Sequence, residues 1–263
     1  MIAYEDDTIL VARDADVATV TLNRPDKLNA LTKAMWRGLG NAIADLSGEA
    51  GLRCIVIRGA GERAFSPGND IGEFAHERAN REQARTYGTV MHATAHALAE
   101  CPIPLVAQIH GICVGGGLEI AALCDLRICG DGSRFGAPIK NLGLVMAYAE
   151  MAPLVRLVGP DVALEILLEG RIFDAAEAQA KGLVTRVVPD GDVAAEAAAT
   201  AARIAEGAPL AARWHKKFAR RLADPAPVSA AEADECFACF DTEDFREGYA
   251  AFLAKRKPQF RGR

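Results

Sequence analysis

Three consecutive glycines, at positions 115–117, separate two apolar segments near the middle of the chain. The segment before them, PIPLVAQIHG, has the apolar run of a buried strand, and the segment after them, LEIAALCD, predicts a short helix. Glycines allow unusual backbone dihedrals and a close approach to a ligand, and the start of a helix leaves free N–H groups and the positive end of the helix dipole. The triplet is therefore either a site for developing negative charge or a tight turn needed for close packing.

The spacing of these glycines differs from that of two common nucleotide-binding loops. It does not match the pattern GxGxxG, and no acidic residue follows at the distance that a dinucleotide site requires. The lysine and the serine or threonine of a phosphate-binding loop are also missing. The motif thus gives no support to either kind of nucleotide site.

Predicted strands and helices alternate along most of the chain. The residue pattern predicts a hairpin over residues 8–23, and Thr32 is placed to cap a helix that ends near Leu46. From about Asp192 onward we expect nearly all helix, so the order predicts an α/β domain with a helical C-terminal appendage. No fixed-period repeat is found. Further strands are predicted at 54–61, 102–111, 126–130 and 183–189, and further helices at 81–100, 118–125, 149–158, 161–168 and 175–182.

Composition and charge narrow the class of protein. Of the 263 residues, 51% are hydrophobic and 25% are charged, which is ordinary for a globular protein, and a net charge of −5 disfavours nucleic acid as a partner. The start MIAYEDDTIL lacks the segments of a signal peptide, and no stretch is apolar enough to span a bilayer. The seven cysteines are odd in number and scattered, so we expect reduced thiols in a cytoplasmic protein without a membrane partner.

A second candidate for the site is the loop AFSPGNDIGEF, residues 64–74. Within it, residues 67–70 form a cluster of turn-forming residues after a predicted strand. A backbone N–H in such a turn is able to act as a second hydrogen-bond donor beside the glycine triplet. The same cluster also suits an ordinary surface turn.

Together the two segments resemble the crotonase superfamily, also called the enoyl-CoA hydratase/isomerase family. AFSPGNDI is similar to that family's loop A-F-x-A-G-x-D-[IL], and HGICVGGGLEIAALCDLRIC is similar to its segment [NH]-G-x-x-x-G-G-G-x-[ED]-[LI]-x-x-x-C-D. Further similar segments are VATVTLNRPDKLNALT, FDAAEAQAKGLVTRVV and FLAKRKPQFRGR. The resemblance therefore extends over essentially the whole chain.

The resemblance implies a fold, a substrate and an assembly. The expected fold is α/β, a crotonase-like spiral of repeated ββα units over residues 1–195, followed by a helical trimerisation region over residues 196–263. The expected activity is chemistry on an acyl-CoA thioester, whose enolate is stabilised in an oxyanion hole. No cofactor is expected, because coenzyme A is part of the substrate, and no metal ion. The expected assembly is a homotrimer or homohexamer.

The family's oxyanion hole consists of two backbone N–H groups, which match those of Asn69 and Gly116. The usual residue at the first position is alanine, so the Asn69 amide is expected either to bond an acyl substituent or to cap the turn. Gly115, Asp70 and Ile71 adjoin the two donors and are expected to contact the substrate.

Glu119 matches one of the two catalytic carboxylates of enoyl-CoA hydratases. It lies three residues after Gly116, in the first turn of the predicted helix, where a glutamate also suits the helix dipole. The residues that follow, 120–123, are apolar, so partial burial is expected to raise its pKa toward the range useful for proton transfer. We interpret Glu119 as a proton-transfer residue.

The sequence departs from the hydratase pattern at the second carboxylate. In FGAPIKNLG the matching residue is Ile139, which cannot transfer a proton and is expected only to contact the substrate. The next segment, LGLVMAYAEMAPL, lacks the usual Pro-Gly. Other branches of the family place an acidic residue at about Ala147. Its neighbours are Tyr148, a candidate proton donor, and Glu150, which is either a base or the exposed start of a helix.

This departure makes efficient hydration of simple enoyl-CoAs the less favoured reaction, and isomerisation or decarboxylation, assisted by Tyr148 or Glu150, is a close rival. Hydration would require a lone Glu119 to handle both the water and the proton. Double-bond isomerisation commonly uses the same missing residue, whereas decarboxylation needs an oxyanion hole and a proton donor but no positioned water. A non-catalytic acyl-CoA binder is an alternative of a different class, and the intact glycines and Glu119 argue against it.

Two segments are expected to bind coenzyme A on the strength of the resemblance. In LNRPDKLNALT, Lys27 is placed to meet a phosphate and the backbone of Ala30 to meet the adenine. Lys255 belongs to a basic segment like the tail that reaches the phosphates in this family, often from a neighbouring subunit. The plain alternatives are a strand-to-helix connection and a solvated basic end.

Two residue pairs at helical spacing have structural interpretations. His92 and His96 share a helix face but lack a third metal ligand, so packing or exposure is favoured, with an approach to the acyl pocket as the alternative. Cys236 and Cys239 have no second pair, and we interpret them as residues of the core or of a subunit contact.

Overall fold

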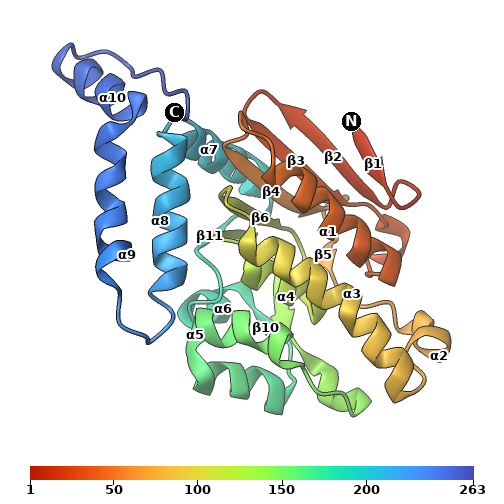
Figure 1. Ribbon diagram of the computed structural model, residues 1–263. Coiled ribbons are helices and arrows are strands. Elements are labelled where there is room, and N and C mark those ends of the chain that lie inside the picture. The colour runs from red at the N-terminus through yellow and green to blue at the C-terminus, as the bar shows by residue number, and fades with distance from the viewer.

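The computed structural model describes all 263 residues, which form two sheets and ten α-helices. Figure 1 shows the sheets and most of the helices in one body, with the last three helices at one side of it. None of the helices is long and apolar enough to cross a membrane. All seven cysteines are free thiols, and five of them are buried.

The larger sheet has seven strands in the order β1-β2-β3-β4-β6-β8-β11. The first three strands pair antiparallel, and all pairs from β3 to β11 are parallel. The hairpin predicted over residues 8–23 is confirmed as the pair β2 and β3. The strands are β1 (Ile2–Tyr4), β2 (Ile9–Asp14), β3 (Val17–Leu22), β4 (Cys54–Gly59), β6 (Leu105–Ile109), β8 (Leu126–Gly130) and β11 (Arg186–Val188).

The smaller sheet has four strands in the order β10-β9-β7-β5. Each of its strands has only two or three residues, and the sequence patterns had predicted none of them. The segments around β5 and β7 were interpreted as a loop and a glycine-rich turn. The strands are β5 (Ala64–Ser66), β7 (Ile112–Val114), β9 (Arg134–Gly136) and β10 (Phe173–Asp174).

One structural unit occurs three times in succession. Each unit adds a strand to the larger sheet, then a strand to the smaller sheet, and then a helix. The units are β4-β5-α3, β6-β7-α4 and β8-β9-α5, with α3 (Arg81–Glu100), α4 (Gly116–Leu123) and α5 (Tyr148–Glu169). This arrangement is the spiral of repeated ββα units that the resemblance implied.

Helix boundaries follow the expected capping residues. Thr32 Oγ1 accepts a hydrogen bond from Met35 N at 3.1 Å, so the predicted cap of α1 (Lys33–Ser47) is confirmed. The two helices predicted at 149–158 and 161–168 form α5, which is interrupted at Gly159, where φ is 78°. Two short helices complete the body, α2 (Phe74–Glu77) and α6 (Ala175–Ala180).

Apolar side chains cover both faces of the larger sheet. Residues of α1, α3 and α4 pack on one face in the main core. On the other face, Ala197 and Ala201 of α7 (Val193–Ala205) pack with Val56 and Val106. The predicted domain boundary between residues 195 and 196 thus falls inside a helix that packs on the sheet, and the division itself stays a prediction.

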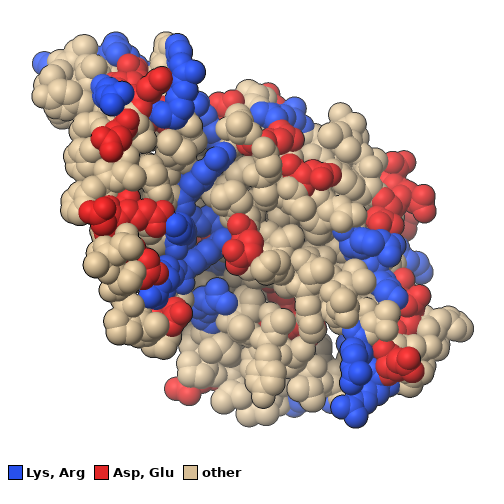
Figure 2. Space-filling view, in the orientation of Figure 1, with Lys and Arg blue, Asp and Glu red and all other residues tan.

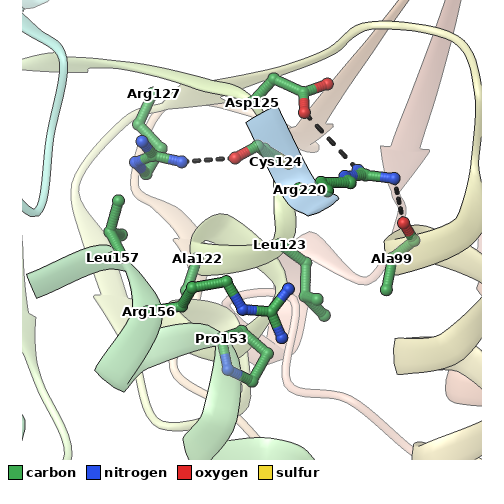
Figure 3. A pocket seen from close by; sticks show the side chains of 10 residues that line it. All are labelled: Ala99, Ala122, Leu123, Cys124, Asp125, Arg127, Pro153, Arg156, Leu157 and Arg220. Atoms are coloured by element: carbon green, nitrogen blue, oxygen red, sulfur yellow. Dashed lines mark hydrogen bonds and ion pairs between the residues drawn. The ribbon is translucent and has the colours of Figure 1, made fainter. Parts of the chain in front are cut away.

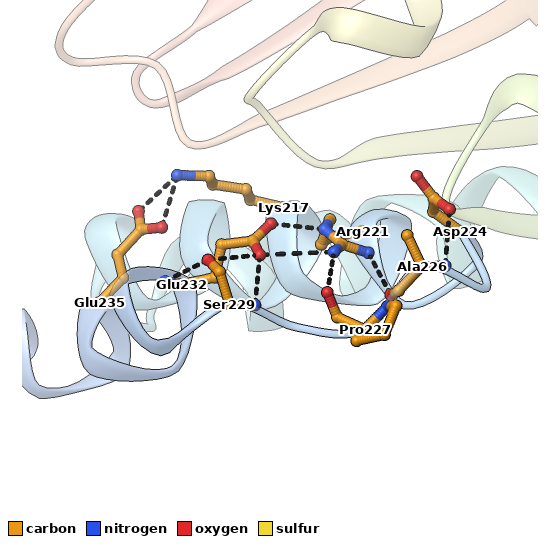
Figure 4. A network of polar contacts seen from close by, with 8 residues as sticks. All are labelled: Lys217, Arg221, Asp224, Ala226, Pro227, Ser229, Glu232 and Glu235. Atoms are coloured by element: carbon orange, nitrogen blue, oxygen red, sulfur yellow. Dashed lines mark hydrogen bonds and ion pairs between the residues drawn. The ribbon is translucent and has the colours of Figure 1, made fainter.

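The C-terminal helices are α8 (Pro209–Arg221), α9 (Ala230–Asp234) and α10 (Glu243–Leu253). Figure 4 shows polar contacts that join α8 to the segment after it. Arg221 Nε donates to Glu232 Oε1 at 2.5 Å, and Ser229 forms a reciprocal capping box with Glu232 at the start of α9. Because the side chains of Arg221 and Glu232 are only partly buried, the contacts fix the direction of the turn more than they add stability.

Candidate active site

The loop after β5 carries Asn69, and Leu31 holds the backbone of this loop. The N–H of Leu31 donates to the C=O of Gly68 at 2.8 Å, and the N–H of Asp70 donates to the C=O of Leu31 at 2.8 Å. The two bonds involve Gly68 and Asp70, the chain neighbours of Asn69, and they form a parallel bridge between Leu31 and Asn69. The N–H of Asn69 therefore points away from Leu31, and it has no hydrogen-bond partner within the chain.

Gly116 is the first residue of α4, so its N–H precedes the helix's own hydrogen bonds. Gly115 makes the turn into the helix with φ of 52°, and its N–H donates to the C=O of Gly136 at 3.0 Å. The loops touch here, because a Cβ atom added to Gly68 would lie 2.8 Å from the nitrogen of Gly116. The two backbone donors of Asn69 and Gly116 thus lie on adjoining segments, an arrangement suited to one oxyanion.

The side chain of Asn69 is held by two neighbouring helices. Its Oδ1 accepts a hydrogen bond from Trp36 Nε1 of α1 at 2.6 Å, and its Nδ2 lies 3.9 Å from Met91 Sδ of α3. The turn cap considered for this amide is not formed. Asp70 caps the next turn instead, accepting from the N–H of Gly72 at 2.9 Å.

Glu119 lies in the first turn of α4, beside the buried apolar residues Leu118 and Ile120. Its side chain keeps some contact with solvent. Burial among these groups, and then the negative charge of Glu150, raise the pKa of Glu119 from 4.5 to about 8, while the charge of Arg78 acts in the opposite direction. At neutral pH Glu119 therefore holds a proton that it can donate.

Glu150 lies in the first turn of α5, with 12% of its side chain exposed. One oxygen, Oε2, accepts from the N–H of Ala147 at 3.0 Å, and the other, Oε1, lies 3.2 Å from His92 Nε2 of α3. Its charge acts on Glu119 across the contact between α4 and α5. Of the alternatives considered for Glu150, the exposed helix start is wrong, because the carboxylate is largely buried and both of its oxygens have partners.

The other candidates near the second carboxylate position lie differently. Tyr148 is 94% exposed at the start of α5, and its side chain makes no hydrogen bond within the chain. Ile139 lies in the 3₁₀ turn Pro138–Leu142 and packs, partly buried, against the main core. Of Ile139, Tyr148 and Glu150, Glu150 is thus the one whose charge acts on Glu119.

The segment proposed to border coenzyme A is joined to the oxyanion loop by an ion pair. Arg24 Nη1 donates to Asp70 Oδ2 at 2.6 Å and to the C=O of Ala30 at 3.1 Å. The Arg24 guanidinium, more than the nearby charge of Lys27, holds the pKa of Asp70 below its usual range. Asp70 is thus engaged in joining two loops, whereas Lys27 and Ile71 are exposed.

Lys255 lies in the segment that follows α10, where it is exposed and has φ of 52°. It makes no ion pair within the chain. The structure of one chain thus keeps Lys255 apart from the contacts that surround Glu119, and its proposed role with a neighbouring subunit stays a prediction.

Several residues of the site were missed or underweighted by sequence reasoning. Trp36 lies outside the segments that resemble the family, Arg24 lies within one of them but was given no role, and His92 was interpreted as a packing or exposed residue. Arg78 lies over the rings of Phe74 and Tyr87, at 4.7 Å and 5.0 Å from their centroids. The sequence gave no signal for the contacts of Trp36, Arg24 and His92 with Asn69, Asp70 and Glu150, because these partners are 33–58 positions away.

A basic groove lies between α8 and the body, away from the glycine loops. Figure 2 shows Lys and Arg side chains along it, and Figure 3 shows the residues that line a cavity at the C-terminal end of α4, the end opposite Gly116. The volume of this cavity is about 190 Å³. Arg220 lies 3.5 Å from Asp125, which also pairs with Lys216 at 2.6 Å. The groove therefore holds structural ion pairs and none of the candidate catalytic residues. No group of three or more His, Cys, Asp or Glu side chains is placed to hold a metal ion.

The chain is similar over nearly its whole length to proteins described as enoyl-CoA hydratases. The model of the family "Enoyl-CoA hydratase/isomerase" matches residues 12–263. A crystal structure of an enoyl-CoA hydratase/carnithine racemase from Magnetospirillum magneticum is 54% identical, with a TM-score of 0.96 over 99% of this chain and 97% of that chain.

Two curated relatives are similar at lower identity. The "Probable enoyl-CoA hydratase echA8" of Mycobacterium tuberculosis is 38% identical over 97% of this chain and 98% of its own length. The crotonyl-CoA hydratase of Syntrophomonas wolfei is 32% identical over 98% of both chains. These similarities confirm the predicted crotonase-like α/β fold.

Proposed function

The chain belongs to the enoyl-CoA hydratase/isomerase family, whose members act on acyl-CoA thioesters, and we propose that its reaction is the addition of water to an enoyl-CoA. The observation that carries the proposal is that Glu119, in the first turn of the helix that Gly116 begins, lies within range of the charge of the largely buried Glu150, across the contact between α4 and α5. Glu150 would act as the second carboxylate, because Ile139 occupies the position where the family normally has that carboxylate. The names of several relatives, among them a crotonyl-CoA hydratase and a short-chain-enoyl-CoA hydratase, support the same reaction.

The thioester oxygen would be bound by two backbone donors. The N–H groups of Asn69 and Gly116 lack partners within the chain, and they lie on segments that touch. As negative charge develops on the thioester oxygen, these donors would stabilise the enolate. Their contribution is larger in a site from which water is largely excluded.

The proton transfers follow from the two carboxyl groups. Glu150, held by the Ala147 N–H and by His92, would accept a proton from water as the water oxygen bonds to C3 of the enoyl group. The electrons of the double bond move to the thioester oxygen. Glu119, whose pKa is about 8, would donate its proton to C2 as the enolate collapses. A proton passed from Glu150 back to Glu119 restores the starting state.

The rest of the substrate would lie along the segment near Asp70. We propose contacts of Lys27 and Ala30 with coenzyme A, and of Gly115, Ile71 and Ile139 with the acyl-pantetheine part. Coenzyme A is part of the substrate, so the proposed reaction needs no further cofactor.

The test is incubation of the protein with crotonyl-CoA in deuterated water, followed by mass spectrometry. We expect the mass of the product to rise by one water with deuterium at C2. Substrate that gains deuterium without water would support isomerisation instead. No change with crotonyl-CoA and loss of carbon dioxide from malonyl-type thioesters would support decarboxylation.

Substitutions assign the roles of the two carboxyl groups. We expect Glu119→Gln and Glu150→Gln each to lower kcat by about 10²-fold or more, because each removes a proton-transfer group. Glu169→Gln, on the same helix as Glu150 but exposed, is the matched control. Tyr148→Phe separates the alternatives, since loss of turnover in that variant would replace Glu150 by Tyr148 as the second proton-transfer residue.

A further inference from the structure

Trp36 contacts both segments that supply the oxyanion donors. It lies in α1 and is 1% exposed. Its Nε1 donates to Asn69 Oδ1 at 2.6 Å, and a Cβ atom added to Gly116 would lie 2.9 Å from its Cζ2. One side chain therefore meets the residue of the first donor and the residue of the second.

Trp36 is itself fixed by two further elements. Thr94 Oγ1 of α3, 1% exposed, donates to the C=O of Trp36 at 2.6 Å. Leu31 packs at the same place, with its Cδ1 3.3 Å from the added Cβ of Gly116. Thr94 thus fixes the backbone of Trp36, while the indole ring and its N–H face Gly116 and Asn69.

We propose that Trp36 is a positioning residue that sets the two N–H donors of the oxyanion hole relative to each other, an inference that rests on the proposed function. The donors belong to separate elements, a loop after β5 and the start of α4. They stabilise one oxygen only when both lie about 2.7–3.1 Å from it. A small misplacement of such groups has a large effect on rate, because the effect of positioning falls steeply with geometry.

A purely structural role has to be distinguished from this one. A buried indole N–H needs an acceptor in any case, and Asn69 supplies it. Such a role would be seen in stability alone. A positioning role changes the chemical step while substrate binding, which depends mainly on the coenzyme A contacts, stays nearly the same.

The experiment compares Trp36→Phe, Asn69→Ala and the double variant. Trp36→Phe removes the N–H and the Cζ2 contact, whereas Asn69→Ala removes the acceptor and keeps the backbone N–H and the indole ring. Asn69→Ala keeps the test valid if Trp36→Phe folds poorly. Trp214→Phe in α8, the same change at the chain's other tryptophan, is the control.

We expect each single variant to lower kcat about tenfold with KM within about twofold, the size of one lost hydrogen bond. The double variant should be no slower than Trp36→Phe, because both changes break the same contact. Unchanged kcat in Trp36→Phe, or effects that multiply in the double variant, would overturn the proposal.

A spectroscopic measurement separates failure of this inference from failure of the proposed function. Butanoyl-CoA with a ¹³C-labelled thioester carbonyl cannot be hydrated, and its carbonyl infrared band moves to lower frequency when an oxyanion hole polarises the bond. We expect that shift in the wild type and a smaller one in Trp36→Phe. Equal shifts would reject the role of Trp36 alone, and no shift in the wild type would reject the oxyanion hole itself.

Discussion

At the scale of single residues, the protonation of Glu119 depends on neighbours from other elements. Burial and the charge of Glu150 raise its pKa, and the charge of Arg78 lowers it. A protonated acid beside a base held by hydrogen bonds is the arrangement that general acid–base chemistry at neutral pH requires. The same arrangement makes ionisation of Glu119 unfavourable to the folded state.

Glu119 should therefore lower stability at alkaline pH. The folded chain binds the proton of Glu119 more tightly than the unfolded chain does, because the pKa is about 8 when folded and about 4.5 when unfolded. The stability from this group is fully present below pH 4.5 and is lost as pH rises through about 8. The side chain that the variant Glu119→Gln carries at this position does not ionise. The free energy of unfolding of this variant should therefore rise relative to that of the wild type as pH rises, by on the order of 1 kcal/mol or more.

Denaturant unfolding of both proteins at pH 5 and pH 9 measures this difference. The substitution removes the titration of Glu119, so the change in the gap reports on Glu119 together with its coupling to Glu150. A gap that stays constant between the two pH values would contradict the raised pKa. In the wild type, kcat should also fall as pH rises through about 8, because the proton donor ionises.

His92 should act through the position of Glu150. The pair is 3.2 Å apart, with 40% of the histidine side chain exposed, so the contact is worth less than a buried one. We expect His92→Ala to lower kcat by roughly threefold to tenfold, and His92→Gln, which keeps a donor, to recover part of the loss. His96→Ala, an exposed change on the same helix, should leave the rate unchanged, and an equal loss in both alanine variants would argue against a specific contact.

Residues predicted from spacing and residues found only in the structure differ in one respect. The glycines, Glu119 and its burial followed from local sequence, because a helix start and its apolar neighbours are adjacent in the chain. Trp36 and Asn69 are 33 positions apart, and His92 and Glu150 are 58 apart. Contacts of that kind depend on how helices pack, and the periodicity of the sequence does not predict them.

At the scale of elements, length decided what the sequence could predict. The strands β2, β3, β4, β6 and β8 of the larger sheet and the longer helices have enough residues for a pattern, and α3 was predicted with its observed bounds. The strands of the smaller sheet have two or three residues, too few for an alternation to be seen. In the sequence, the glycines near these strands indicated turns. In the structure, Gly117 allows the strand β5 to lie against α4.

Close contact between α4 and β5 should make Gly117 intolerant of a side chain. A Cβ atom there would lie 2.3 Å from the C=O oxygen of Ser66, which is backbone and cannot rotate away. We expect Gly117→Ala to destabilise the protein by about 1–3 kcal/mol or more, by forcing the two elements apart. Gly191→Ala is the control, because that glycine has open space around it and no positive φ. Equal midpoints of denaturant unfolding for the two variants would contradict this packing.

At the scale of the whole molecule, the C-terminal helices present aromatic side chains to solvent. Phe237, Phe240, Tyr249 and Phe252 are 54–83% exposed, and Phe240 packs on Phe245 with ring centroids 4.8 Å apart. A grouped apolar surface of this kind on a single chain usually marks a contact with another protein. The family resemblance makes a second copy of the chain the expected partner, in a trimer or hexamer.

Charges placed on this surface should separate the subunits. We expect the double variant Phe240→Glu and Phe252→Glu to sediment as a smaller species than the wild type, because burying two carboxylates in an apolar contact costs several kcal/mol per group. Ile2→Glu, a change of the same kind at an exposed residue of β1, should leave the mass unchanged. Analytical ultracentrifugation at several concentrations measures both. A wild type that sediments as a monomer would reject the assembly. A wild-type oligomer that the double variant preserves would place the contact elsewhere, and the aromatic surface of the C-terminal helices would then need another partner.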